Sequence, residues 1–224
     1  MAKPPGAVHS GVAETLTDKP DPKPKLWLAS RSPRRRQLLD EAGLAHEAGH
    51  PGFEDGDLRP GQVTPGQWVA ALAYLKAAAG REHAIDGRIV LGADTAIVKD
   101  GTLIGTPRDA AEASAILHRL SNGHHQVLSG VSLISPCGRR LLFVDSATVF
   151  MGEIGDERIR EYVASGQWQG KAGGYNLRER LASGWPIRFE GDPTTIMGLP
   201  MRALLTRLRA FRNVVEGSLA GDAA

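Results

Sequence analysis

The sequence has one cysteine, few aromatic residues and no long apolar run. Because Cys137 is alone among 224 residues, a disulfide framework within the chain is excluded and a reducing compartment is expected. No apolar run approaches the roughly 18 residues that a membrane-spanning helix needs, and residues 1–20 lack the apolar core of a secretory signal. We therefore expect a globular, cytoplasmic protein without a membrane partner.

An excess of either charge is also missing. The chain carries 27 basic and 25 acidic residues, a formal net charge of +2, whereas a dedicated nucleic-acid binder usually has a strong basic excess. Dedicated nucleic-acid binding is therefore not expected. A chain of this length, with 42% hydrophobic residues, can bury a sizeable core. We predict a disordered proline-rich tail over residues 1–24, a single domain over 25–216 and a flexible C-terminus over 217–224.

Alternating strand and helix patterns fill the predicted domain. A capping residue followed by proline marks helix starts at Ser32, Thr64 and Thr106, and Asp100-Gly101 marks a tight hairpin turn. The expected strands are 26–29, 89–98, 126–134 and 141–151, and the expected helices are 33–43, 64–79, 106–120, 156–164 and 201–215. Because helical crossovers and hairpins both occur, we predict a three-layer α/β fold with a mixed sheet.

Three arginines follow the first strand at the start of the first predicted helix, within the segment LASRSPRRRQLL. The free N–H groups and the positive dipole end of a helix favour an anion there, whereas arginine opposes the dipole. The arrangement is therefore unfavourable unless an anion binds, which favours a phosphate site over the alternative of a solvated basic face.

Asp94 interrupts an otherwise apolar strand, 89–98. A buried carboxylate is costly unless it is paired, hydrogen-bonded or bound to a metal, so a functional role is favoured over a purely structural one. Lys76 falls on the helical arc of Val69, Leu72 and Ala73, which is expected to pack on the sheet. Its ammonium group either extends to solvent or meets a phosphate or Asp94.

One zinc-site pattern is rejected. His46-Glu47-Ala48-Gly49-His50 matches H-E-x-x-H, a motif that works only on a helix, where both histidines share one face. Glycines flank and interrupt this segment, and Pro51 disfavours helix at the preceding residue. We therefore do not expect a zinc-protease site.

The motifs LASRSPRRRQLL, LGADT, GTPRDAAEA, KAGGY and GDPTTIMGLP occur in this order over residues 26–208 and together resemble the Maf-type nucleotide pyrophosphatases. The resemblance implies a fold like that of the inosine-triphosphate pyrophosphatases. It also implies hydrolysis of nucleoside triphosphates to the monophosphate and pyrophosphate with a divalent cation, Mg²⁺ or Mn²⁺, and a homodimer.

The resemblance assigns roles to particular residues. Asp94 corresponds to the aspartate of the family's G-A-D-T strand, and we expect it to be the general base and a metal ligand, with Asp55 as a second metal ligand. The expected substrate-binding residues are Ser30, Arg34, Arg35, Asp55, Lys76, Thr95, Lys171 and Arg178. Arginine forks and a lysine suit the oxygens of a triphosphate.

Two departures from the family pattern bear on the substrate. Thr106 replaces a lysine of the family's G-K-P segment, and Arg178 stands where the family often has glutamine. Arg34 and Thr95 resemble the branch that acts on pyrimidine triphosphates, whereas Asp192-Pro193-Thr194 resembles the branch that acts on 7-methyl-GTP. The leading hypothesis is a nucleoside triphosphate pyrophosphatase. The alternative is a nucleotide-binding regulator of cell division that does not turn its ligand over.

Overall fold

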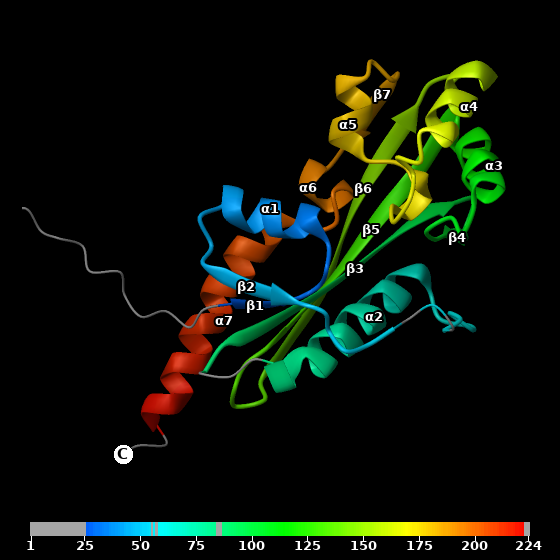
Figure 1. The fold of residues 1–224 in the computed structure, drawn as a ribbon. Helices are drawn as coiled ribbons and strands as arrows, with labels where there is room; N and C mark the ends of the chain where they lie inside the picture. Colours follow the sequence, from blue (N-terminus) through cyan, green and yellow to red (C-terminus); the bar gives the residue numbers. More distant parts are fainter. Residues whose placement is uncertain (1–25, 55, 57, 84–86, 222–224) are drawn as a thin grey trace, which may run out of the picture.

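The computed structural model describes residues 26–54, 56, 58–83 and 87–221 (Figure 1). The predicted tail, residues 1–24, and Asp55 lie outside the described residues. The strands are β1 Leu26–Ala29, β2 His46–Gly49, β3 Ile89–Lys99, β4 Thr102–Ile104, β5 Gly123–Ile134, β6 Arg140–Met151 and β7 Ile187–Glu190. The α-helices are α1 Pro33–Glu41, α2 Pro65–Ala79, α3 Ala110–Leu120, α4 Asp156–Ala164, α5 Leu177–Ala182, α6 Pro193–Ile196 and α7 Met201–Gly221. Short 3-10 helices, η1 Gly80–His83 and η2 Ala172–Gly174, complete the set.

The strands form one mixed sheet in the order β2-β1-β3-β5-β6-β7, with β4 paired to β3. β1 runs parallel to both β2 and β3, and the remaining pairs are antiparallel. Helices cover both faces of this sheet, so the predicted three-layer α/β fold with a mixed sheet is confirmed.

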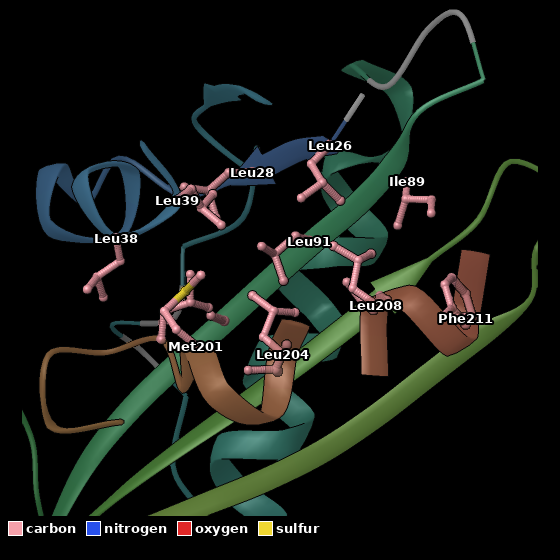
Figure 2. Packing of buried hydrophobic residues seen from close by; sticks show 14 of the residues in the cluster. Leu26, Leu28, Leu38, Leu39, Ile89, Leu91, Met201, Leu204, Leu208 and Phe211 are labelled. Carbon is pink, nitrogen blue, oxygen red and sulfur yellow. The ribbon is translucent and has the colours of Figure 1, made fainter. Parts of the chain in front are cut away.

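One hydrophobic core lies between the sheet and the last helix. Leu204 and Leu208 of α7 pack against Leu28 of β1 and Leu91 of β3, and α1 adds Leu38 and Leu39. Figure 2 shows these side chains pointing toward one another from α1, α7 and the two strands. Helix α1 and helix α7 therefore share one face of the sheet.

Helix α2 covers the opposite face of the sheet and lies very close to the strands. A Cβ added to Gly92 of β3 would come within 2.2 Å of the Ala73 carbonyl, and one added to Gly130 of β5 within 2.3 Å of the Val69 carbonyl. Only glycine fits at this distance, because any side chain would overlap the helix backbone. The two glycines thus fix the height and register of α2 over the sheet.

Local signals placed most elements correctly. The Thr64 capping box is present at the start of α2, with both of its hydrogen bonds, and α4 has the predicted bounds. At the hairpin turn between β3 and β4, Asp100 and Gly101 have φ values of 51° and 71°, as a two-residue turn of this kind requires.

Other boundaries were wrong. Helix α3 begins at Ala110, capped by Asp109, and not at Thr106-Pro107, because the Asp109 side chain accepts a hydrogen bond from the backbone N–H of Glu112. Helix α7 continues to Gly221, beyond the predicted end near residue 215. The H-E-x-x-H segment forms β2 and extends into the turn after it, which agrees with the rejection of a zinc-protease site. Strands β2 and β7 and the short helices α5 and α6 were not predicted.

Candidate active site

The candidate site lies where β3 changes partners. Pairing with β1 ends at Leu91, and pairing with β4 on the same side begins at Ile97, so the intervening segment with Asp94 and Thr95 lies beyond the end of β1 (Figure 1). The chain leaves β1 toward α1 on one face of the sheet and leaves β2 toward α2 on the other. Such switch points in α/β sheets leave a crevice at the carboxyl ends of the strands, which is a common ligand site.

Asp94 and Lys76 form an ion pair at this position. The Lys76 Nζ lies 2.6 Å from Asp94 Oδ1, and the two side chains are only 15% and 12% exposed. The close packing of α2 over Gly92 and Gly130 brings this lysine to the strand. The structure thus selects the contact with Asp94 from the alternatives that the sequence left open for Lys76.

A cavity of about 250 Å³ opens beside this ion pair, and its wall has two kinds of residue. Its charged lining residues are Asp94, Lys76, Arg34 and Arg35. Its larger apolar and aromatic lining residues are Ile97, Val127, Ala172, Tyr175, Ile196 and Met197. A second cavity, of about 140 Å³, shares Lys76 and Arg35 with the first and is lined also by Ser30, Arg31, His50 and Phe53. Charged and apolar side chains therefore line the same cavity, as a ligand with a phosphate end and a flat base requires.

The two candidate arginines have different environments. Arg35 is held inside the protein by hydrogen bonds from Nε to the Gly198 carbonyl at 2.8 Å, from Nη1 to Ser30 Oγ at 3.2 Å and from Nη2 to Thr95 Oγ1 at 3.3 Å. Arg34 lines the same cavity, and its guanidinium makes no hydrogen bond or ion pair with the described part of the chain. Burial lowers the pKa of Arg34 from its ordinary value, although Glu179 and Tyr162 act in the opposite direction. A partly desolvated guanidinium with open donors favours an anion.

Gly198 allows its own carbonyl to reach Arg35. Its φ of 102° lies in the region that favours glycine, and an added Cβ would be 3.3 Å from Thr95 Oγ1. The glycine of the GDPTTIMGLP segment is therefore needed both for its backbone conformation and for the close approach to Thr95.

Two predicted site residues lie outside the cavity wall and hold acidic partners. Lys171 forms an ion pair with Glu179 at 2.5 Å. Arg178 binds the Glu41 carboxylate with two hydrogen bonds, of 2.8 and 3.2 Å, and thereby joins α5 to α1. Glu41 holds the pKa of Arg178 above its ordinary value. Arg178 also lines a small adjoining cavity with Arg34 and Met197.

Asp192, which suggested the 7-methyl-GTP branch, has a structural role. Its carboxylate accepts hydrogen bonds from the Thr194 backbone at 2.9 Å, from the Thr194 hydroxyl at 2.7 Å and from the Arg202 backbone at 3.2 Å. It thus caps α6 and the first turn of α7. This explains the residue without reference to a nucleobase.

Sequence reasoning missed a buried pair that includes Tyr175 of the cavity wall. His125 of β5 is 1% exposed, and its Nε2 lies 2.8 Å from the Tyr175 hydroxyl. Burial, followed by the charges of Lys99 and His124, lowers the pKa of His125 to about 4, and burial raises the pKa of Tyr175. The only sequence signal was Tyr175 itself, at the end of KAGGY, because an isolated histidine in a strand predicts no particular partner.

The described residues contain no group of three or more histidine, cysteine, aspartate or glutamate side chains arranged to hold a metal ion. The expected second ligand, Asp55, lies outside the described residues. Asp94 is the carboxylate of the main cavity, which fits a hard cation held by one or two carboxylates and by substrate phosphates. None of the helices in the described ranges is long and apolar enough to cross a membrane.

The family model and the curated relatives show the family of this chain. The chain is similar to a protein named dTTP/UTP pyrophosphatase from Salinibacter ruber, at 41% identity over 87% of this chain and 95% of the relative. It is also similar to one of the same name from a Geobacillus strain, at 39% identity over 79% and 92%. A solved dITP/XTP pyrophosphatase from Mycobacterium abscessus matches 58% of this chain and 75% of its own, with a TM-score of 0.35 and 17% identity. The family model described as Maf-like protein matches residues 25–211. The chain therefore belongs to the Maf-like protein family.

Proposed function

We propose that this protein hydrolyses pyrimidine nucleoside triphosphates, with dTTP and UTP preferred, to the nucleoside monophosphate and pyrophosphate. The observation that carries the proposal is the Lys76–Asp94 pair in the wall of a cavity that charged and apolar side chains both line. The curated relatives align with most of this chain and are named dTTP/UTP pyrophosphatase. Their name supports the choice of reaction and of base.

The triphosphate carries about four negative charges near neutral pH, so catalysis depends mainly on positioning and charge neutralisation. Arg34, with its open donors, and Lys76 bind the phosphate oxygens. Ser30 borders the second cavity, which we assign to the leaving pyrophosphate. Arg35 acts through its fixed contacts, because it holds the Gly198 carbonyl and Thr95 in place. Lys171 and Arg178 support the wall of the site through their ion pairs.

Asp94 is the general base of the proposed reaction. One carboxylate oxygen is bound to Lys76, and the other accepts a proton from water as the water oxygen attacks the α-phosphorus. A bond from the water oxygen to the α-phosphorus forms, the bond from that phosphorus to the oxygen bridging to the β-phosphate breaks, and pyrophosphate leaves.

A divalent cation, Mg²⁺ or Mn²⁺, belongs to the same proposal. Asp94 and Asp55 are the carboxylates that would hold it, and it would neutralise charge on the phosphates. We also propose a cytoplasmic homodimer, as the family resemblance implies, and light scattering of the purified protein tests the dimer.

The test is pyrophosphate release from dTTP, UTP, CTP, 7-methyl-GTP and ITP, with and without Mg²⁺ or Mn²⁺, for the native chain and Asp94→Asn. We expect release from dTTP and UTP that requires the cation and falls at least about a hundredfold in the variant, as is typical for loss of a general base. Nucleotide binding without release from the native chain would instead support the regulator. A wild-type rate in Asp94→Asn would remove Asp94 from the mechanism.

A further inference from the structure

A line of hydrogen bonds leads from the wall of the main cavity into the core. Thr95 of β3 and Ser129 of β5 are directly opposite each other in the sheet, with their hydroxyl oxygens 2.8 Å apart. The Ser129 hydroxyl also lies 2.8 Å from the Thr195 carbonyl, in helix α6. Ser129 and Thr195 are fully buried, whereas Thr95 is half-buried and lines the cavity.

The direction of these bonds follows from counting protons. A carbonyl oxygen can only accept, so Ser129 uses its one proton on Thr195 and must accept the proton of Thr95. The opposite direction would send the Thr95 proton to the Gly198 carbonyl at 3.5 Å, where Arg35 Nε already donates at 2.8 Å. Two bonds of 2.8 Å are therefore retained in the first arrangement and only one in the second.

The Thr95 oxygen is consequently left as an acceptor. Its proton is used on Ser129, and Arg35 Nη2 donates to it at 3.3 Å, so what it presents to the cavity is a lone pair. Phosphate oxygens are themselves acceptors and gain nothing there. The neighbouring Arg35 guanidinium also disfavours a metal ion at this oxygen.

We propose that Ser129 is a positioning residue that fixes Thr95 as a hydrogen-bond acceptor for an N–H or O–H donor on the nucleoside half of the substrate. The inference rests on the proposed function for the identity of the ligand. Side chains alternate along a strand, so Thr95 shares its face of β3 with Ile97, beside the apolar wall, whereas Asp94 lies on the face of Lys76. The donor is either the N3–H of a uracil or thymine base or the 3′-hydroxyl of the sugar.

The experiment compares nucleotides that exchange a donor for an acceptor of similar size. Cytosine replaces the N3–H of uracil by a lone pair, and a 3′-fluoro group replaces the sugar hydroxyl. We therefore measure kcat/KM for dUTP, dCTP and 3′-fluoro-2′,3′-dideoxyuridine triphosphate with the native chain and with Ser129→Ala. At the position that Thr95 contacts, the ratio of kcat/KM for the donor nucleotide to that for the acceptor nucleotide should fall about tenfold in Ser129→Ala. Without Ser129, one hydrogen bond no longer opposes rotation of the Thr95 hydroxyl.

Two further variants separate positioning from folding. Ser132→Ala removes another buried hydroxyl of β5, one that has no hydrogen-bond partner in the described part of the chain. It should leave unchanged the two ratios of kcat/KM, dUTP over dCTP and dUTP over the 3′-fluoro nucleotide. Ser129→Thr keeps the hydroxyl and should restore the preference. The Thr195 carbonyl retains the Gly198 N–H at 3.1 Å in every variant, so the wall is still supported.

An equal loss on all three nucleotides, with both ratios within twofold of the native values, would overturn the inference, as would a native preference for the acceptor at both positions. If the native chain releases no pyrophosphate, the proposed function fails separately. The same ratios are then taken from calorimetric dissociation constants of the three nucleotides, which test the role of Ser129 without turnover.

Discussion

The buried His125 predicts a specific loss of stability in mild acid. In the unfolded chain the imidazole has its ordinary pKa of 6.5, whereas burial lowers the pKa to about 4 in the folded protein. Between pH 6.5 and pH 4 the imidazole is therefore protonated in the unfolded chain but neutral in the folded one. The free energy of unfolding falls as the pH falls toward 4. The full difference corresponds to about 3 kcal/mol, of which about 2 kcal/mol is lost by pH 5.

Urea unfolding at pH 7.5 and pH 5 measures this loss. His125→Gln keeps an amide that can hydrogen-bond the Tyr175 hydroxyl but does not titrate, so its free energy of unfolding should fall by about 2 kcal/mol less than that of the native chain over the same interval. His124→Gln, on the exposed neighbouring residue, is the matched control and should keep most of the loss, because the charge of His124 is the smallest of the three causes that lower the pKa of His125. Equal losses in the native chain and His125→Gln would refute the reasoning, because another group would then carry the pH dependence.

Two further predictions concern the sheet and the cavity. Gly130→Ala places a Cβ 2.3 Å from the Val69 carbonyl and should lower the free energy of unfolding in urea by at least about 2 kcal/mol. Gly155→Ala is the control, because a Cβ there meets no atom within 4 Å. An equally small loss at both positions would mean that α2 moves away easily. Thr106→Lys adds a cation to the cavity wall and should lower the KM for dTTP about fivefold, worth about 1 kcal/mol, whereas Thr102→Lys on β4 should not. An unchanged KM in Thr106→Lys would show that this position does not contact the phosphates.

The sequence predicted best where the physical cause is local. The Thr64 capping box, the Asp100-Gly101 turn and the apolar arc of α2 each depend on residues a few positions apart. Strand β2 was missed because HEAG has neither alternation nor branched residues; its backbone pairs with β1. Helix α5 was missed because six residues are too few for a period, and its start depends on an Asn176 cap.

The same division runs through the candidate site. The sequence by itself determined that Asp94 stands in an apolar strand, that arginines open the first helix, and that five motifs occur in the order of a known family, because these are facts of residue type and spacing. The tertiary structure decided which arginine has open donors, since Gly198 and Thr95 occupy Arg35 from distant parts of the chain. It also decided that Lys76 contacts Asp94 and that Ser129 orients Thr95, because packing across the sheet sets both distances.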